Sequence, residues 1–222
     1  MRQVLEAGHT AAMVIPKIAI VELPRQEWTD LIPTLLHNMG TDGGRAGIKQ
    51  CTLEALGYVC EEIGSMALQG VADNVLSQEH VNNILTAVVS GMTKDETDNT
   101  VRLAATTALY NALEFAHNNF DNETERNYLM QVICEGTICS DSRVRVASFE
   151  CLVKIASDYY EVLPAYMTEL YKLTVRAIQQ DDEDVAKQAI EFWSTLCDEE
   201  IDIIEVGDLY CTLRLTITLP LC

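Results

Sequence analysis

Apolar residues recur every three to four positions over most of this chain, which is the spacing of amphipathic helices. One broad stripe of this kind consists of Val101, Ala104, Ala105, Ala108, Leu109 and Ala112. The pattern predicts nine helices, at about 8–22, 27–38, 46–63, 79–92, 99–117, 122–138, 142–160, 165–179 and 183–200. Pro16 falls inside the first helix, and we expect it to kink that helix.

Residues that cap or break helices mark several of the predicted boundaries. Asp98 and Asp141 stand at N-cap positions, and Pro24 and Pro164 interrupt the chain between helices. The glycine-rich stretch 40–47 precedes a helix, but it lacks a preceding strand and the Gly-Lys-Ser/Thr ending of a phosphate-binding loop. We therefore predict a turn there. Short links between most helices make neighbours antiparallel.

A short pattern is repeated along the chain: an acidic residue, two spacers, an aliphatic residue, a basic residue and then small residues. It is clear at 98–104 and 141–147, and weaker at 182–189 and from Ile48 onward. The aliphatic anchors Ile48, Val101, Val144 and Val185 are 53, 43 and 41 residues apart. A period near 40 residues with helical content predicts an all-α HEAT-repeat solenoid, a right-handed superhelix of antiparallel helix pairs.

The repeats divide the chain into three parts. We expect the second helix of an incomplete repeat over 1–24, about four repeats over 25–204, and a divergent tail over 205–222. Residues 213–219 in that tail alternate like a strand and match no repeat. Neither end carries the polar cap of a solenoid, so we expect both ends to be prone to association.

Composition narrows the kinds of partner. The chain has 34 acidic and 15 basic residues and a formal charge of −19, which repels nucleic acids and anionic membranes and attracts basic partners. The alternative is that this charge serves solubility alone. Eight cysteines form no C-x-x-C pair and stand mostly among apolar residues, which favours reduced thiols in a cytosolic or nuclear protein. No apolar run approaches membrane-spanning length.

Catalytic and metal-binding motifs are not recognisable. The four histidines lie on different predicted elements, and none has a cysteine or carboxylate at ligand spacing, so no zinc site is predicted. Neither a nucleophile elbow nor a kinase motif occurs, and carboxylate pairs are expected by chance among 34 acids. We predict a protein that is not an enzyme and needs no cofactor.

Acidic residues align with the repeat anchors. Six and thirteen residues beyond the anchors, acids occupy six of eight places. They are Glu54, Glu61, Glu114, Glu150, Glu191 and Asp198. Positions seven apart share a helix face, so the second helices of the pairs carry an acidic stripe that we expect on the concave wall. A surface for a basic partner is favoured over an ordinary solvated face, which remains the alternative.

The first helices carry a different patch, made of Leu85, Thr86 and Val89 on one helix and Tyr128 and Leu129 on the next. Stacking would bring these residues together as a shallow apolar groove. From spacing alone, however, such residues are more often part of the core.

Four segments closely resemble the importin beta family: 51–60, 84–92, 101–106 and 191–200. The resemblance runs from about Ala11 to Ile204 and covers HEAT repeats from the amino-terminal third of a longer family member. It departs at Pro16, where the family tends to have a small residue, and after about Glu205. The family carries cargo through nuclear pores, is emptied by Ran-GTP and often takes cargo through a basic adaptor. The resemblance therefore implies an import receptor of the cytoplasm, nucleus and nuclear pore.

The resemblance also implies binding sites, and it reverses the preference for core in the apolar patch. A pocket for the Phe-Gly motifs of nucleoporins would consist of Leu85, Thr86, Val89, Glu125, Tyr128 and Leu129. A second pocket would use Tyr166 and Leu173, while Glu191 and Asp198 would face a basic part of Ran. Binding to Ran and cargo is expected to be weak, because the family spreads those surfaces over further repeats. The alternative function is a HEAT-repeat scaffold of a protein phosphatase or another assembly.

Overall fold

The computed structural model describes residues 2–40, 46–68 and 75–206, and this part of the chain is helical without any strand. The long helices are α1 (Arg2–Glu22), α2 (Leu31–Gly40), α3 (Ala46–Leu68), α4 (Gln78–Met92), α5 (Asn99–Ala112), α7 (Glu123–Gly136), α8 (Ser142–Asp158), α9 (Met167–Gln180) and α10 (Glu183–Val206). The short elements are η1 (Leu23–Arg25), η2 (Leu113–Phe115), α6 (His117–Asp121) and η3 (Tyr160–Ala165).

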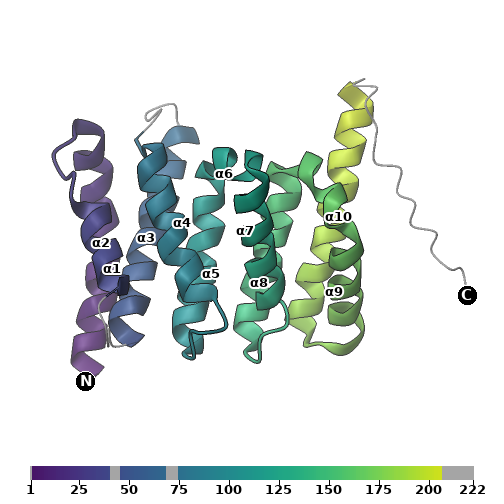
Figure 1. Cartoon of the computed structure of the whole chain (residues 1–222), viewed down its shortest axis with the longest axis horizontal. Helices are drawn as coiled ribbons and strands as arrows, with labels where there is room; N and C mark the ends of the chain where they lie inside the picture. Colours follow the sequence, from purple (N-terminus) through teal and green to yellow (C-terminus); the bar gives the residue numbers. More distant parts are fainter. Residues whose placement is uncertain (1, 41–45, 69–74, 207–222) are drawn as a thin grey trace, which may run out of the picture.

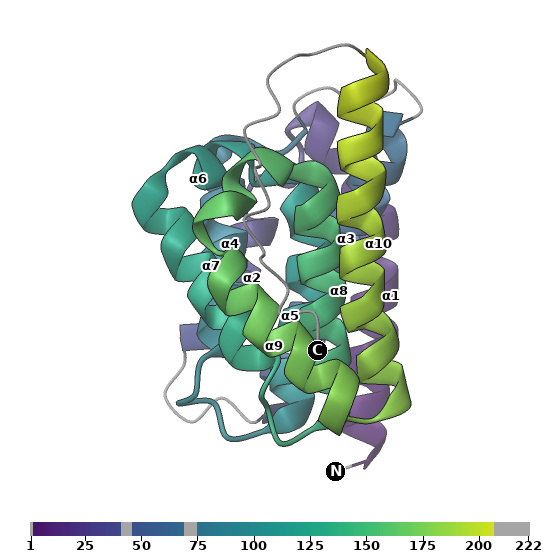
Figure 2. The ribbon, with the colours of Figure 1, turned by 90° about the vertical axis from the view of Figure 1, so that its right-hand side faces the viewer.

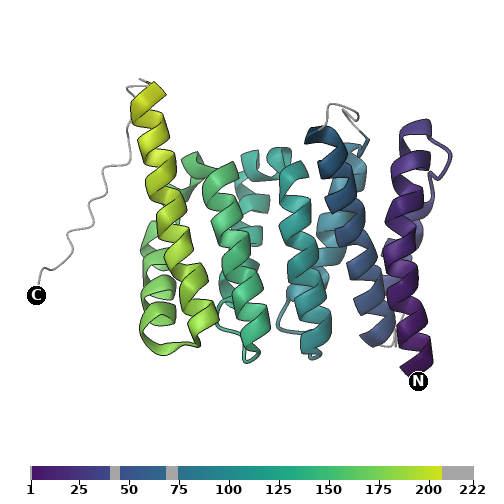
Figure 3. The same ribbon diagram turned by 180° about the vertical axis from the view of Figure 1, so that it is seen from behind.

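The helices form two layers, seen edge-on in Figure 2. The first-helix row consists of α2, α4, α7 and α9 and faces the viewer in Figure 1. The second-helix row consists of α1, α3, α5, α8 and α10 and faces the viewer in Figure 3. Members of the second-helix row pack against one another more extensively than members of the first-helix row do. The all-α solenoid predicted from the sequence is confirmed.

Four antiparallel pairs follow α1 along the stack: α2–α3, α4–α5, α7–α8 and α9–α10. We propose the same division into repeats that the sequence predicts, with α1 as the second helix of a pair and four pairs after it. Most of the predicted tail, including 213–219, and most of the glycine-rich turn lie outside the described residues. The apolar faces of all the pairs join in one continuous core, whose largest fully buried side chains include Phe120, Phe149 and Phe192.

The predicted N-caps are confirmed. Asp98 accepts a hydrogen bond from the backbone N–H of Thr100 at 2.8 Å, and Asp141 accepts one from that of Arg143 at 3.0 Å. These contacts satisfy backbone donors that the first turn of a helix leaves unpaired. Helix α1 continues through Pro16 to Glu22.

The predicted helix over 99–117 is wrong in its last five residues. Helix α5 ends at Ala112 and is followed by η2 and α6. The hydroxyl of the buried Tyr159 donates a hydrogen bond to the carbonyl of Leu113, and the Phe120 ring stacks on Tyr159 at 4.0 Å between centroids. These contacts come from the next repeat, so the periodicity of the segment itself does not reveal the break. The predicted helix over 27–38 likewise begins only at Leu31, after a turn.

The basic residue of the repeated pattern links one repeat to the next. Lys49 Nζ lies 2.8 Å from Glu96 Oε2, and Arg102 Nη1 lies 3.2 Å from Cys139 Sγ. Glu96 lies in the connection between α4 and α5, and Cys139 lies in the connection between α7 and α8. Each acceptor therefore belongs to the helix pair that follows.

In the two clear copies of the pattern the aliphatic residues Val101 and Val144 are fully buried, whereas Ile48 of the degenerate copy is 48% exposed. The step therefore supplies core residues in its clear copies, and its basic residue binds the neighbouring repeat.

Candidate binding surfaces

The predicted Phe-Gly pocket lies where α4 and α7 meet in the first-helix row. Leu85, Val89 and Leu129 are only 6%, 7% and 4% exposed, so they belong to the core beneath this surface. Thr86 is exposed, and the Tyr128 side chain is 51% exposed. The predicted residues thus lie on two helices that contact each other, and their exposure is unequal.

A polar network fixes one end of this surface. Asn119 donates hydrogen bonds to Asn82 Oδ1 at 2.8 Å and to Glu125 Oε2 at 2.6 Å. Gln78 donates to Asn119 Oδ1 at 3.1 Å, so α4, α6 and α7 are held together. Sequence reasoning missed Asn119, because it falls in the link between two predicted helices, whereas the structure places it in α6. The Glu125 carboxylate therefore stands at the rim of the surface in a fixed position.

The second predicted pocket lies between α7 and α9. The Tyr166 hydroxyl donates to Asn127 Oδ1 at 2.5 Å and accepts from Arg126 Nε at 3.2 Å. Leu173 lines a hollow of about 240 Å³ near the end of α7, together with Ile138 and Arg176. The two residues are thus both placed at the α7–α9 junction, two helical turns apart.

All six predicted acidic residues lie on the second-helix row or on η2, which continues α5. Glu61, Glu191 and Asp198 are exposed, whereas Glu54, Glu114 and Glu150 are half-buried. The Glu114 carboxylate packs so closely on α3 that a Cβ added at Gly64 would lie 2.4 Å from it. Of the six, the three exposed carboxylates are the most accessible to a partner.

Two adjoining hollows lie on this same row. One, of about 240 Å³, is lined by residues including Glu54 and Tyr58, and the other, of about 430 Å³, by residues including Glu150 and Lys187. Both share Leu103, Thr107 and Arg143. Sequence reasoning missed the cations of this face. Arg143 is paired with Asp141 at 2.7 Å and Lys187 with Glu183 at 2.9 Å, so the acids still dominate the unpaired charge.

We expect the buried thiols behind these surfaces to be unreactive. Burial, together with the charge of Glu114, raises the pKa of Cys60 to about 12, and burial raises that of Cys151 as well. A protonated thiol is a poor nucleophile. Among the described helices, none is both long and apolar enough to cross a membrane.

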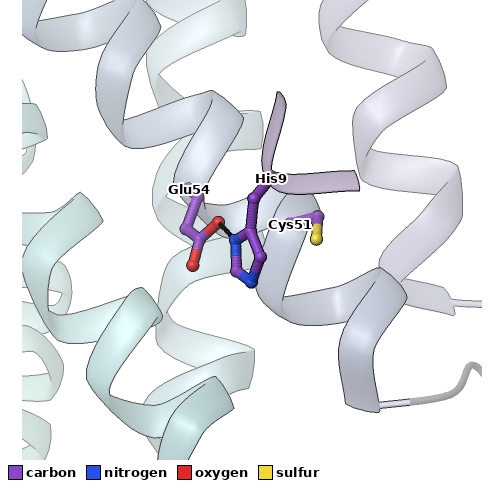
Figure 4. Close-up of side chains that lie close together, drawn as sticks. All are labelled: His9, Cys51 and Glu54. Carbon is purple, nitrogen blue, oxygen red and sulfur yellow. Dashed lines mark hydrogen bonds and ion pairs between the residues drawn. The ribbon is translucent and has the colours of Figure 1, made fainter. Parts of the chain in front are cut away.

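One histidine has a cysteine and a carboxylate beside it in space, although no such residue stands at ligand spacing in the sequence. His9, on α1, lies beside Cys51 and Glu54 on α3, as Figure 4 shows. The three residues are close because α1 and α3 pack side by side, and sequence spacing cannot reveal such a contact.

Comparisons with known proteins place this fold. Residues 29–202 match the family described as "Stalled ribosome sensor GCN1-like, HEAT repeats". The chain belongs to the HEAT-repeat family. Within this family it is homologous to importin beta: it is 54% identical to importin subunit beta-1 of Arabidopsis thaliana over 200 residues, which are 90% of this chain and 22% of that protein. Identity to importin subunit beta-1 of Schizosaccharomyces pombe is 46% over 89% of this chain and 22% of that protein.

Solved structures agree with the sequence relatives. A crystal structure of importin beta from an ammonium sulfate condition matches 91% of this chain and 23% of its own, at 45% identity and a TM-score of 0.79. A Kap95:Nup1 complex matches 95% of this chain and 24% of its own, at 41% identity and a TM-score of 0.77. In a third structure, Kap95p binding induces the switch loops of RanGDP to adopt the GTP-bound conformation. It matches 95% of this chain and 24% of its own, at 40% identity and a TM-score of 0.79. Kap95p is yeast importin beta. This HEAT-repeat chain thus spans about a fifth of the length of its curated relatives, 22%.

Proposed function

We propose that this chain works as part of a nuclear import receptor of the importin beta type, in the cytoplasm, in the nucleus and at the nuclear pore. The observation that carries the proposal is the 54% identity to importin subunit beta-1 over 90% of the chain. The relatives are transport receptors, which also supports a role without catalysis.

The first-helix row would bind the Phe-Gly motifs of nucleoporins at Leu85, Thr86, Val89, Glu125, Tyr128 and Leu129. The exposed Tyr128 ring beside buried apolar residues supports this, as does the solved complex of Kap95 with Nup1. Burying one phenylalanine contributes at most about 3 kcal/mol, so a single contact is weak. Many weak contacts along one nucleoporin give avidity while each remains rapidly reversible. Tyr166 and Leu173 would serve a second motif in the same way.

The second-helix row would bind basic partners. Glu61, Glu191 and Asp198 are exposed there, and a face of one sign attracts a basic surface over about 10 Å at moderate salt. Ran is the first candidate, since a structure of yeast importin beta includes it. A basic adaptor or cargo segment is the second. Because the chain spans 22% of its relatives' length, we expect both interactions to be weaker than in the longer proteins.

A pull-down tests the proposal. The chain is incubated with immobilised Phe-Gly repeats, with Ran loaded with GDP or GTP, and with a protein phosphatase catalytic subunit. We expect retention on the Phe-Gly repeats, and weaker, salt-sensitive retention on Ran-GTP. Retention on the phosphatase subunit without any on the Phe-Gly repeats would overturn the proposal and favour a phosphatase scaffold.

A further inference from the structure

Three potential metal ligands meet on the second-helix row, away from the Phe-Gly surface. A ring nitrogen of His9, the Sγ of Cys51 and a carboxylate oxygen of Glu54 all lie within 4.8 Å of one another (Figure 4). His9 Nδ1 is 2.5 Å from Glu54 Oε2. All three residues are half-buried, so an ion can reach them from solvent.

The packing of α1 on α3 holds this cluster in place. Cys51 and Glu54 are three residues apart on α3 and therefore share a face. A Cβ added at Gly8 would lie 2.6 Å from Cys51 Sγ, so the glycine allows the α1 backbone to approach the thiol. Gln50 Nε2 donates to Glu54 Oε1 at 2.9 Å and orients the carboxylate. Hydrogen bonds of this kind to a ligand group commonly support metal sites.

We propose that His9, Cys51 and Glu54 bind one divalent transition-metal ion, with Zn²⁺ as the best match. Imidazole, thiolate and carboxylate are the donors that zinc uses, and three protein ligands leave a fourth position for water. Donors around one zinc ion lie about 3–4 Å apart, given bond lengths of roughly 2.0–2.3 Å. The three ligand atoms lie within 4.8 Å of one another, which is close to this spacing.

The charges balance when the ion binds. A cysteine binds a metal ion as the thiolate, so the Cys51 thiol gives up its proton on binding. Binding displaces this proton to solvent, and the resulting thiolate and the Glu54 carboxylate together neutralise a dication, with a neutral imidazole as the third ligand. The chain's formal charge of −19 further attracts cations to this face.

The competing explanation is a purely structural His9–Glu54 hydrogen bond that joins α1 to α3. The two explanations differ in their dependence on Cys51. A structural hydrogen bond needs no thiol, whereas a zinc-type site loses its most strongly bonding ligand when the sulfur is removed.

Titration of the reduced, chelator-treated chain with Co²⁺ tests the site, because cobalt bonded to a thiolate gives a charge-transfer absorption in the near ultraviolet. We expect this absorption to saturate at one equivalent and to disappear when Zn²⁺ is added. Cys51→Ser should abolish it, and His9→Ala and Glu54→Gln should weaken binding at least about 100-fold, since loss of a mere supporting contact costs 10–100-fold. Cys197→Ser, Cys211→Ser and Cys222→Ser are matched controls and should bind as the wild type does.

Thermal unfolding with and without Zn²⁺ provides the second measurement. Zinc should raise the midpoint of the wild type and of the control variants, but not that of Cys51→Ser. The proposal is overturned if the wild type gives no saturable cobalt absorption. It is also overturned if Cys51→Ser retains the absorption, or if a control variant loses it instead.

Discussion

Arg145 and Asp181 form a bidentate ion pair that joins two neighbouring repeats, with Nη2 2.6 Å from Oδ1 and Nε 2.9 Å from Oδ2. Arg145 lies on α8, and Asp181 lies in the short connection before α10. Both side chains are largely buried, at 15% and 19% exposure. Arg145 also donates to the carbonyl of Cys139 at 2.8 Å. The basic residue of the repeated motif is therefore a link along the solenoid as well as a sequence marker.

Asp181→Asn should lower the free energy of unfolding by about 2 kcal/mol. This value lies between the effect of an exposed ion pair, about 0–1 kcal/mol, and that of breaking a fully buried one, about 3–5 kcal/mol. Asp182→Asn is the matched control, because Asp182 is 68% exposed and its contact with Arg145 is longer, at 3.4 Å. Urea denaturation followed by circular dichroism measures both variants. If Asp181→Asn and Asp182→Asn lower the free energy of unfolding equally, the bidentate geometry does not add to stability.

The same pair should make stability depend on pH. Burial alone would raise the pKa of Asp181, but hydrogen bonds from Arg145 and the Asp182 backbone outweigh it, and the pKa lies below its ordinary value of 3.8. A carboxyl with a lowered folded-state pKa stabilises the fold above its unfolded-state pKa, and this contribution is lost as the pH falls through the folded-state value. Urea midpoints between pH 7 and pH 3 should therefore fall less steeply for Asp181→Asn than for the wild type. Parallel curves would contradict the assignment.

Tyr159→Phe should destabilise the chain by about 0.5–1.5 kcal/mol, the net contribution of one hydrogen bond. The buried Tyr159 hydroxyl donates to the carbonyl of Leu113 at the break after α5, and the substitution leaves that carbonyl with only the bond from the backbone N–H of Ala116 at 3.0 Å. Tyr110→Phe serves as the control, since Tyr110 is 41% exposed. Thermal or urea unfolding distinguishes the two variants. If Tyr110→Phe is as harmful as Tyr159→Phe, the hydroxyl contact is not what stabilises the break.

Thiol labelling should follow burial. Burial raises the pKa of Cys60 to about 12, and this buried thiol should remain unlabelled by a maleimide until the chain unfolds, whereas the half-buried Cys134 should react slowly. Cys197 is exposed and should react first among the cysteines of the described residues. Mass spectrometry of peptides after short labelling times gives the order. Early labelling of Cys60 would mean that the α3–α5 packing opens readily.

Much of the fold follows from the sequence, because the apolar spacing of an amphipathic helix is visible in the helix's own residues. Asp98 and Asp141 also act locally, through the next two residues, and so their capping role is predictable. The end of α5 is different, because Tyr159 reaches back from the following repeat to determine it. The His9–Cys51–Glu54 cluster is invisible for the same reason, since α1 and α3 meet only in the folded chain.

The structure changes which residue best tests the proposed Phe-Gly surface. Leu85 is 6% exposed and lies in the core, so Leu85→Ala would cost about 2–5 kcal/mol of stability along with any loss of binding. Tyr128 is 51% exposed, so its substitution should change the surface more than the core. Tyr110, on the other row and 41% exposed, offers a control of the same residue type.

The most direct test of the account is a calorimetric titration of a Phe-Gly repeat peptide into the wild type, Tyr128→Ala and Tyr110→Ala, with unfolding midpoints measured alongside. The account predicts that Tyr128→Ala weakens binding about 5–10-fold, since loss of an aromatic contact is worth about 1 kcal/mol. Tyr110→Ala should bind as the wild type does, and both variants should remain folded. Identical affinities for Tyr128→Ala and the wild type would contradict the assignment of this surface.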